Sequence, residues 1–156
     1  SAPIRQVRIG DMVLWEEGET IHPTAAKLFA AVNPYLGDMP ANAKIAEILG
    51  IFQQFGPYTN ELQTAKEPYG WTIVLDASLS TAGEDRAREA MAVDSCAMLA
   101  TVRNLGYVTW RYRTDAGTQT YTVTAEDASS LTGENIKSYG ESARGLQALV
   151  EILKTR

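Results

Sequence analysis

The stretch Glu61-Leu-Gln-Thr-Ala-Lys-Glu-Pro-Tyr-Gly-Trp-Thr-Ile-Val-Leu-Asp76 decides how this chain folds. Residues 61–64 begin an alternating pattern, and residues 71–75 are mostly aromatic or β-branched, which is typical of half-buried strands. Between these halves, Pro68 has no amide hydrogen to donate and Gly70 can adopt a positive φ. The stretch therefore predicts two strands joined by a turn at Pro68-Tyr69-Gly70.

A long helix and a second pair of strands follow the first pair. The helix is expected over residues 84–104, with a stripe of apolar side chains. Residues 107–113 alternate strictly, and a turn at Asp115-Ala-Gly117 predicts that residues 118–124 pair with them. Short helices and a last amphipathic helix, ending near Lys154, complete the chain. The order β-β-α-β-β-α predicts an α+β two-layer sandwich, a mostly antiparallel sheet with helices packed on one face.

The front of the chain adds strand and helix signals of its own. Residues 7–15 alternate around a Gly-Asp pair, which fits two short strands or one bulged strand. A short helix is expected over residues 24–32. A second helix is expected over residues 43–55, with Asn42 as its N-cap.

Length and composition favour a single folded domain. The chain has 156 residues, of which 45% are hydrophobic and 21% charged. A boundary near residue 39 would divide an N-terminal β-α extension, 1–39, from a main body, 40–156. The net charge of −5 argues against non-specific nucleic-acid binding, and no apolar run is long enough to span a membrane.

One cysteine, Cys96, excludes an intrachain disulfide. That is compatible with a reducing compartment, and also with an exported protein that lacks disulfides. The chain starts at Ser1 without an initiator Met, so we expect a mature form whose front has been removed.

The histidine and the cysteine offer little chemistry. His22 is the only histidine, so neither a zinc site nor a Ser-His-Asp triad is expected, and a loop or capping role is favoured. Cys96 lies in the middle of the predicted long helix, without a Lys or Arg within one turn. A packing role is therefore favoured over a reactive thiol.

Carboxylates are the remaining catalytic candidates. Glu84 and Asp85, and likewise Glu126 and Asp127, stand at predicted helix starts, where acidic side chains favour the helix dipole. Thr81 and Glu84 have the spacing of a capping box. A third acidic group indicates a solvated turn, and it consists of Glu16, Glu17 and Glu19. A glycosidase-type pair stays open, because its two members need only be close in space.

Aromatic side chains mark two further candidate surfaces. Trp110 and Arg111 lie on opposite faces of one strand, which favours a core face and a solvent face over a nucleic-acid platform. Tyr69 and Trp71, with Glu67 beside them, lie at the predicted strand bend. They either pack inward or line a binding groove, and we take these three as the candidate binding residues.

Three segments carry a family resemblance: residues 42–49, Glu61-Leu-Gln-Thr64 and Glu67-Pro-Tyr-Gly70. Over residues 40–153 the chain resembles the bacterial domain-of-unknown-function family 4825. The resemblance implies an extracytoplasmic domain of a lipoprotein or of a membrane-peptidase-type sensor, anchored through a lipid or a membrane domain upstream. It implies no activity, cofactor or metal.

We therefore expect a non-enzymatic, extracytoplasmic module that senses a ligand or contacts another protein. Its partner would be an unknown protein or a small envelope ligand, with no nucleic acid and no cofactor. One alternative is a carboxylate-dependent hydrolase that acts on cell-envelope material. The other is a structural spacer between neighbouring domains.

Overall fold

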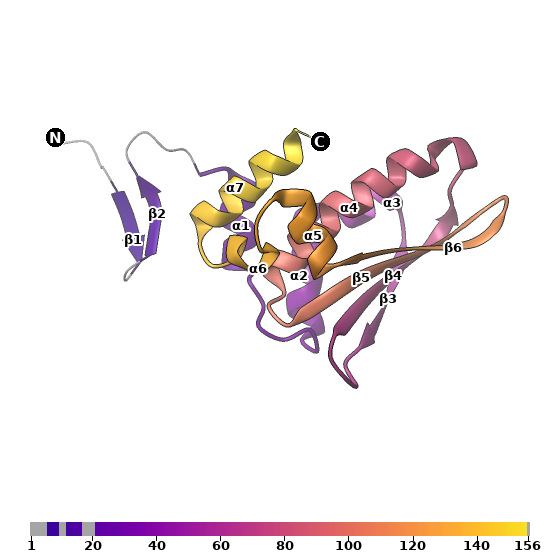
Figure 1. Ribbon diagram of the computed structural model, residues 1–156, viewed down its shortest axis with the longest axis horizontal. Coiled ribbons are helices and arrows are strands. Elements are labelled where there is room, and N and C mark those ends of the chain that lie inside the picture. Colours follow the sequence, from indigo (N-terminus) through magenta and orange to yellow (C-terminus); the bar gives the residue numbers. More distant parts are fainter. Residues whose placement is uncertain (1–5, 10–11, 17–20, 156) are drawn as a thin grey trace.

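A computed structural model of the chain describes residues 6–9, 12–16 and 21–155. Figure 1 shows helices gathered on one side of a twisted sheet. The elements are, in chain order, β1 (Gln6–Ile9), β2 (Met12–Glu16), α1 (Pro23–Ala30), α2 (Met39–Leu49), α3 (Ile51–Phe55), β3 (Tyr58–Gln63), β4 (Tyr69–Ser78), the 3₁₀-helix η1 (Thr81–Gly83), α4 (Glu84–Thr101), β5 (Leu105–Thr114), β6 (Gly117–Thr124), α5 (Ala125–Thr132), α6 (Ile136–Tyr139) and α7 (Ala143–Lys154).

The main sheet has four strands in the order β3-β4-β5-β6. Strands β3 and β4 pair antiparallel, as do β5 and β6, whereas the central pair β4 and β5 is parallel. Helix α4 makes the crossover between the parallel strands, as such a connection requires. The predicted α+β class with a mostly antiparallel sheet is confirmed. Of the two alternatives for the front of the chain, the two short strands are present as an antiparallel pair, and the Gly10-Asp11 turn expected between them lies outside the described residues.

The turn of the first hairpin is not where the sequence predicted it. Gln63 pairs with Gly70, so the chain reverses over residues 64–68 and Tyr69 already belongs to β4. Gly70 is not among the glycines with positive φ. It is needed for space, because a Cβ on Gly70 would lie 2.1 Å from the ring of Tyr107 on the neighbouring strand. Gly70 therefore marks a close approach between two strands and not a turn.

The second helix also differs from the prediction. Its N-cap is Asp38, whose Oδ1 accepts a hydrogen bond from the amide of Ala41. Asn42 lies inside the helix and is buried, where its Nδ2 donates to the carbonyl of Leu36 at 2.6 Å. Gly50, with φ of 73°, ends α2 and separates it from α3, as a left-handed C-cap does.

The two predicted helix starts in the second half had different outcomes. The capping box at Thr81 is wrong, because residues 81–83 form η1, capped by the hydroxyl of Ser80. Helix α4 then starts at Glu84 without a side-chain cap. Helix α5 starts at Ala125, close to the expected position, with Thr124 as its N-cap and Asp127 completing a reciprocal capping box.

The core lies between the sheet and the helices, with α4 at its centre. Trp71 and Trp110 on the inner face of the sheet are fully buried, and the Nε1 of Trp110 donates to Ser95 of α4 at 2.8 Å. Residues 94–101 of α4 are all buried, so this helix has neighbours on several sides. Leu28 of α1 belongs to the same core. The middle of α4 is therefore an interior position where a polar side chain needs a partner.

Candidate functional site

The three residues predicted at the strand bend occupy three different environments. Trp71 is fully buried, and its Nε1 donates to Asn60 Oδ1 at 2.8 Å. Tyr69 is half-buried against the core, and Glu67 is exposed in the turn. None of the three lines either of the two cavities described below.

The other side chains singled out from sequence have structural roles. His22 is the N-cap of α1, with Nδ1 accepting from the amide of Thr24 at 3.1 Å, so the capping interpretation is confirmed. Cys96 is fully buried in the core. Glu84 and Asp127 lie in first turns of helices, as expected. Across residues 6–9, 12–16 and 21–155, no group of three or more His, Cys, Asp or Glu side chains is placed to hold a metal ion.

A cavity of about 190 Å³ lies where α1, α2, α4 and α7 meet. Its walls are mainly aliphatic, and only one carboxylate reaches them. The lining residues are Thr24, Leu28, Leu49, Val93, Asp94, Ala97, Leu149, Val150, Leu153 and Lys154. We call this the Asp94 cavity.

Asp94 itself is incompletely hydrogen-bonded. The residue is only 5% exposed, and its Oδ1 accepts one long hydrogen bond, 3.3 Å, from Gln54 Nε2 of α3. Its Oδ2 is buried and has no hydrogen-bond partner in the part of the chain that the structure describes. Burial raises the pKa of Asp94 to about 7, although the Gln54 bond opposes that shift. A buried acceptor without a donor costs about 1–3 kcal/mol, so folding alone does not favour this arrangement.

Sequence reasoning did not select Asp94, although a signal was present. The residue lies three positions after Met91 and four before Met98, inside the apolar stripe of α4. Residues at those spacings share one helix face. A carboxylate within the buried stripe of a helix is therefore the pattern that would have identified this site.

A larger groove of about 860 Å³ adjoins the Asp94 cavity, and Val93 lines both. Arg88 dominates the groove. Its Nε donates to Tyr112 Oη at 2.8 Å, its Cζ lies 5.3 Å from the ring centroid of Tyr121, and it pairs with Glu84 at 3.5 Å. Because this guanidinium already has partners, the groove offers a ligand less than the Asp94 cavity does.

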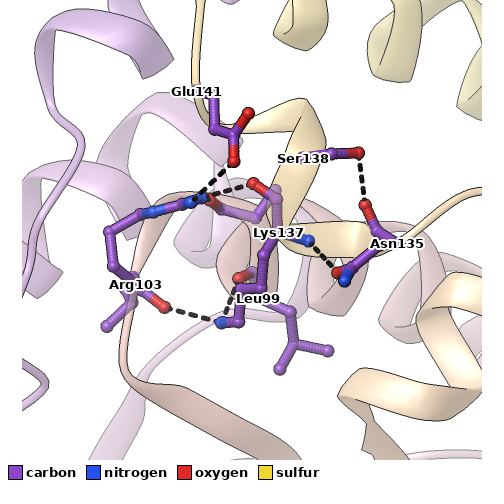
Figure 2. Close-up of polar contacts among 8 residues, drawn as sticks. Leu99, Arg103, Asn135, Lys137, Ser138 and Glu141 are labelled. Atoms are coloured by element: carbon purple, nitrogen blue, oxygen red, sulfur yellow. Dashed lines mark hydrogen bonds and ion pairs between the residues drawn. The ribbon is translucent and has the colours of Figure 1, made fainter.

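Lys137 is another ionisable side chain in this helical layer, and all of its hydrogen-bond donors have partners. Its Nζ donates to the carbonyls of Leu99, Val102 and Leu105 at 2.6, 3.0 and 2.7 Å. Figure 2 shows Arg103 beside it, and Arg103 Nη1 donates to the Lys137 carbonyl at 2.6 Å. Burial, with the charge of Arg103, lowers the pKa of Lys137 to about 8, whereas the three carbonyls favour the ammonium. This lysine ties α6 to the end of α4 and has no donor left for a ligand.

No helix in the described part of the chain is long and apolar enough to cross a membrane. Comparison with curated proteins finds no match, and comparison with solved structures finds none either.

A family model does match, over residues 28–124, and its description is "Domain of unknown function (DUF4825)". The match begins in α1, earlier than the expected residue 40, and ends with β6. It includes the first hairpin and the whole of α4 with Asp94, whereas α7 lies beyond it. Since the match covers more than half of the chain, this protein belongs to the DUF4825 family of domains of unknown function.

Proposed function

We propose that this chain is a non-enzymatic, ligand-sensing domain and that its ligand binds in the Asp94 cavity. The observation that carries the proposal is the buried Oδ2 of Asp94, which has no hydrogen-bond partner among the described residues, in a side chain that lines a mainly aliphatic cavity. Ligand pockets in proteins are mostly apolar, with a few polar groups that fix orientation. The Asp94 cavity has this composition, so it replaces the strand bend as the proposed binding site.

The size of the cavity suits a small ligand. An engineered cavity of 150 Å³ in another protein binds benzene, and the Asp94 cavity measures about 190 Å³. A ligand that enters would contact four helices together. Because such a ligand binds the folded chain and not the unfolded one, binding would raise the stability of the domain.

The hydrolase alternative fits this site less well. Glycoside hydrolysis by carboxylates uses two groups, roughly 5–10 Å apart, on either side of the bond that breaks. Asp94 is the one carboxylate among the residues that line the cavity. A purely structural spacer fits less well too, because it gives no reason for a costly, unpartnered acceptor in the core.

The proposed compartment is extracytoplasmic, with a lipid anchor or membrane domain upstream. This part of the proposal rests on the family resemblance alone. Protease accessibility of the full-length protein on intact bacterial cells tests it. Cleavage of the domain on intact cells is the expected result, and protection until the cells are lysed would contradict it.

A fragment screen followed by ¹H–¹⁵N NMR tests the binding function. The library should hold small amines, sugars, short peptides and cell-wall fragments. We expect at least one small compound to shift the amide signals of Leu28, Asp94 and Leu149. The matched control is Ala97→Leu, which fills the cavity from α4 and should abolish those shifts in a protein that still unfolds cooperatively. Binding that maps only to other surfaces, or no binding by any fragment, would contradict the proposal.

A further inference from the structure

We infer that the Asp94 cavity binds a small organic monocation, a primary amine with a compact apolar body, through an ion pair between its ammonium group and Asp94. This inference rests on the proposed function and adds the chemical class of the ligand. It follows from three features: the buried oxygen of Asp94 that lacks a partner, the mainly aliphatic walls of the cavity and the charge at its rim.

Asp94 Oδ2, which lacks a partner, requires a hydrogen-bond donor, and a charged donor suits it best. Gln54 supplies one long hydrogen bond to Oδ1, and Oδ2 has none. Hydrogen bonds between an ionised donor and a carboxylate are roughly twice as strong as those between neutral groups. An ammonium group brings three donors and also compensates the charge of Asp94, which a neutral hydroxyl cannot do.

The walls select a compact hydrocarbon. Leu28, Leu49 and Leu149 come from three different helices and line the cavity with Asp94, together with Val150 and Leu153. A cavity slightly larger than one that accepts benzene fits a cycloalkyl or short branched alkyl group. A sugar is less suitable, because the mainly aliphatic walls offer its hydroxyl groups few hydrogen-bond partners.

The charge at the rim of the cavity favours a ligand with only one positive charge. Lys154 of α7 is exposed and is the other ionisable residue among those that line the cavity. Its ammonium would repel a second positive charge on the ligand, so diamines and polyamines are disfavoured. An anionic ligand held by Lys154 is the opposite arrangement, and the experiment below distinguishes the two.

The experiment is an NMR titration of the chain at pH 8 with cyclohexylamine, cyclohexanol and cyclohexanecarboxylate. These probes share one ring and differ in the polar group, and the ring is of benzene size. For the native chain we expect cyclohexylamine to bind at least about tenfold more tightly than cyclohexanol. In Asp94→Asn, the amine should lose at least about tenfold in affinity, and cyclohexanol should change by about twofold or less.

A pH series on the native chain gives a second test that needs no variant. Asp94 must ionise to pair with the ammonium, and its pKa is about 7. Between pH 5.5 and pH 8 the ionised fraction rises about 30-fold, so amine affinity should rise toward that limit.

The outcomes separate the ligand class from the proposed function. Cyclohexanol that binds as tightly as the amine, with shifts at the cavity, would overturn the monocation and leave the binding site intact. Tighter binding of the carboxylate that is lost in Lys154→Ala would also overturn it, in favour of an anion. Absence of cavity shifts with all three probes would overturn both.

Discussion

Asp94, in the middle of α4, and Lys137, against the end of that helix, are both ionisable side chains in the helical layer, but their hydrogen bonding differs. All three hydrogens of the Lys137 ammonium are bonded to carbonyls. Asp94 has one long bond to Gln54 and an oxygen without a partner. Both residues are largely enclosed, so burial alone does not distinguish them, but the number of satisfied hydrogen bonds does.

In the proposed function, this difference separates a structural group, Lys137, from a ligand-binding group, Asp94. A buried charge with all its partners present fixes neighbouring segments, as Lys137 fixes α6 on α4. A buried charge that lacks partners costs stability, which makes it a candidate for a site where a ligand supplies the missing partner. The contrast can be tested by removing each group in turn.

The largest expected effect concerns the pH dependence of stability. The pKa of Asp94 is raised from 3.8 to about 7 in the folded chain, so between these values the folded state binds more protons than the unfolded state. The free energy of unfolding should therefore fall as pH rises from about 4 to 7, by up to roughly 4 kcal/mol from this group. Urea denaturation of the native chain and of Asp94→Asn at pH 4 and pH 7 gives the free energy of unfolding of each protein. The contribution of Asp94 is the difference between the pH dependences of the two proteins. Parallel pH profiles of the two proteins would contradict it.

Removal of Lys137 should have the next largest effect. Lys137→Met leaves the carbonyls of Leu99, Val102 and Leu105 without their side-chain donor, and we expect a loss of about 3 kcal/mol in the free energy of unfolding. Lys154→Met is the matched control, because Lys154 is exposed and should change stability by no more than about 0.5 kcal/mol. Chemical denaturation measures both variants. Equal effects would show that Lys137 has no special structural role.

The smallest expected effect is at Gln54. In the native chain, the hydrogen bond from Gln54 to Asp94 Oδ1 lowers the pKa of Asp94. Gln54→Leu removes this bond. The pKa of Asp94 should therefore rise further, and stability at pH 8 should fall by about 1 kcal/mol. Carboxyl NMR and denaturation measure the two quantities. A pKa that stays unchanged would mean that Gln54 has no influence on the carboxylate.

The fold could largely be predicted from local patterns. Strict alternation identified β5, and alternation together with aromatic and β-branched residues identified the first hairpin. The stripe of apolar side chains identified α4. The errors came from contacts between distant residues. Gly70 was read as a turn glycine because the ring of Tyr107, 37 positions later in the chain, is invisible to local reasoning. Asn42 was read as a cap although it is a buried donor to Leu36.

The site could not be predicted for the same physical reason. Asp94 depends on α1, α2 and α7, which close the cavity, and on α3, which contributes Gln54. None of these contacts is local to α4. The sequence did contain a carboxylate within an apolar stripe, but whether it was bonded, exposed or unpartnered was decided by packing alone.

The most direct measurement is a ¹³C NMR titration of the Asp94 carboxyl group, with and without saturating cyclohexylamine. We predict a pKa near 7 without the amine, as burial requires, and a fall of at least about one unit when the amine is bound. A carboxyl group that titrates near its ordinary value of about 4, or one whose pKa does not respond to the amine, would contradict the assignment of this cavity as a cation-binding site.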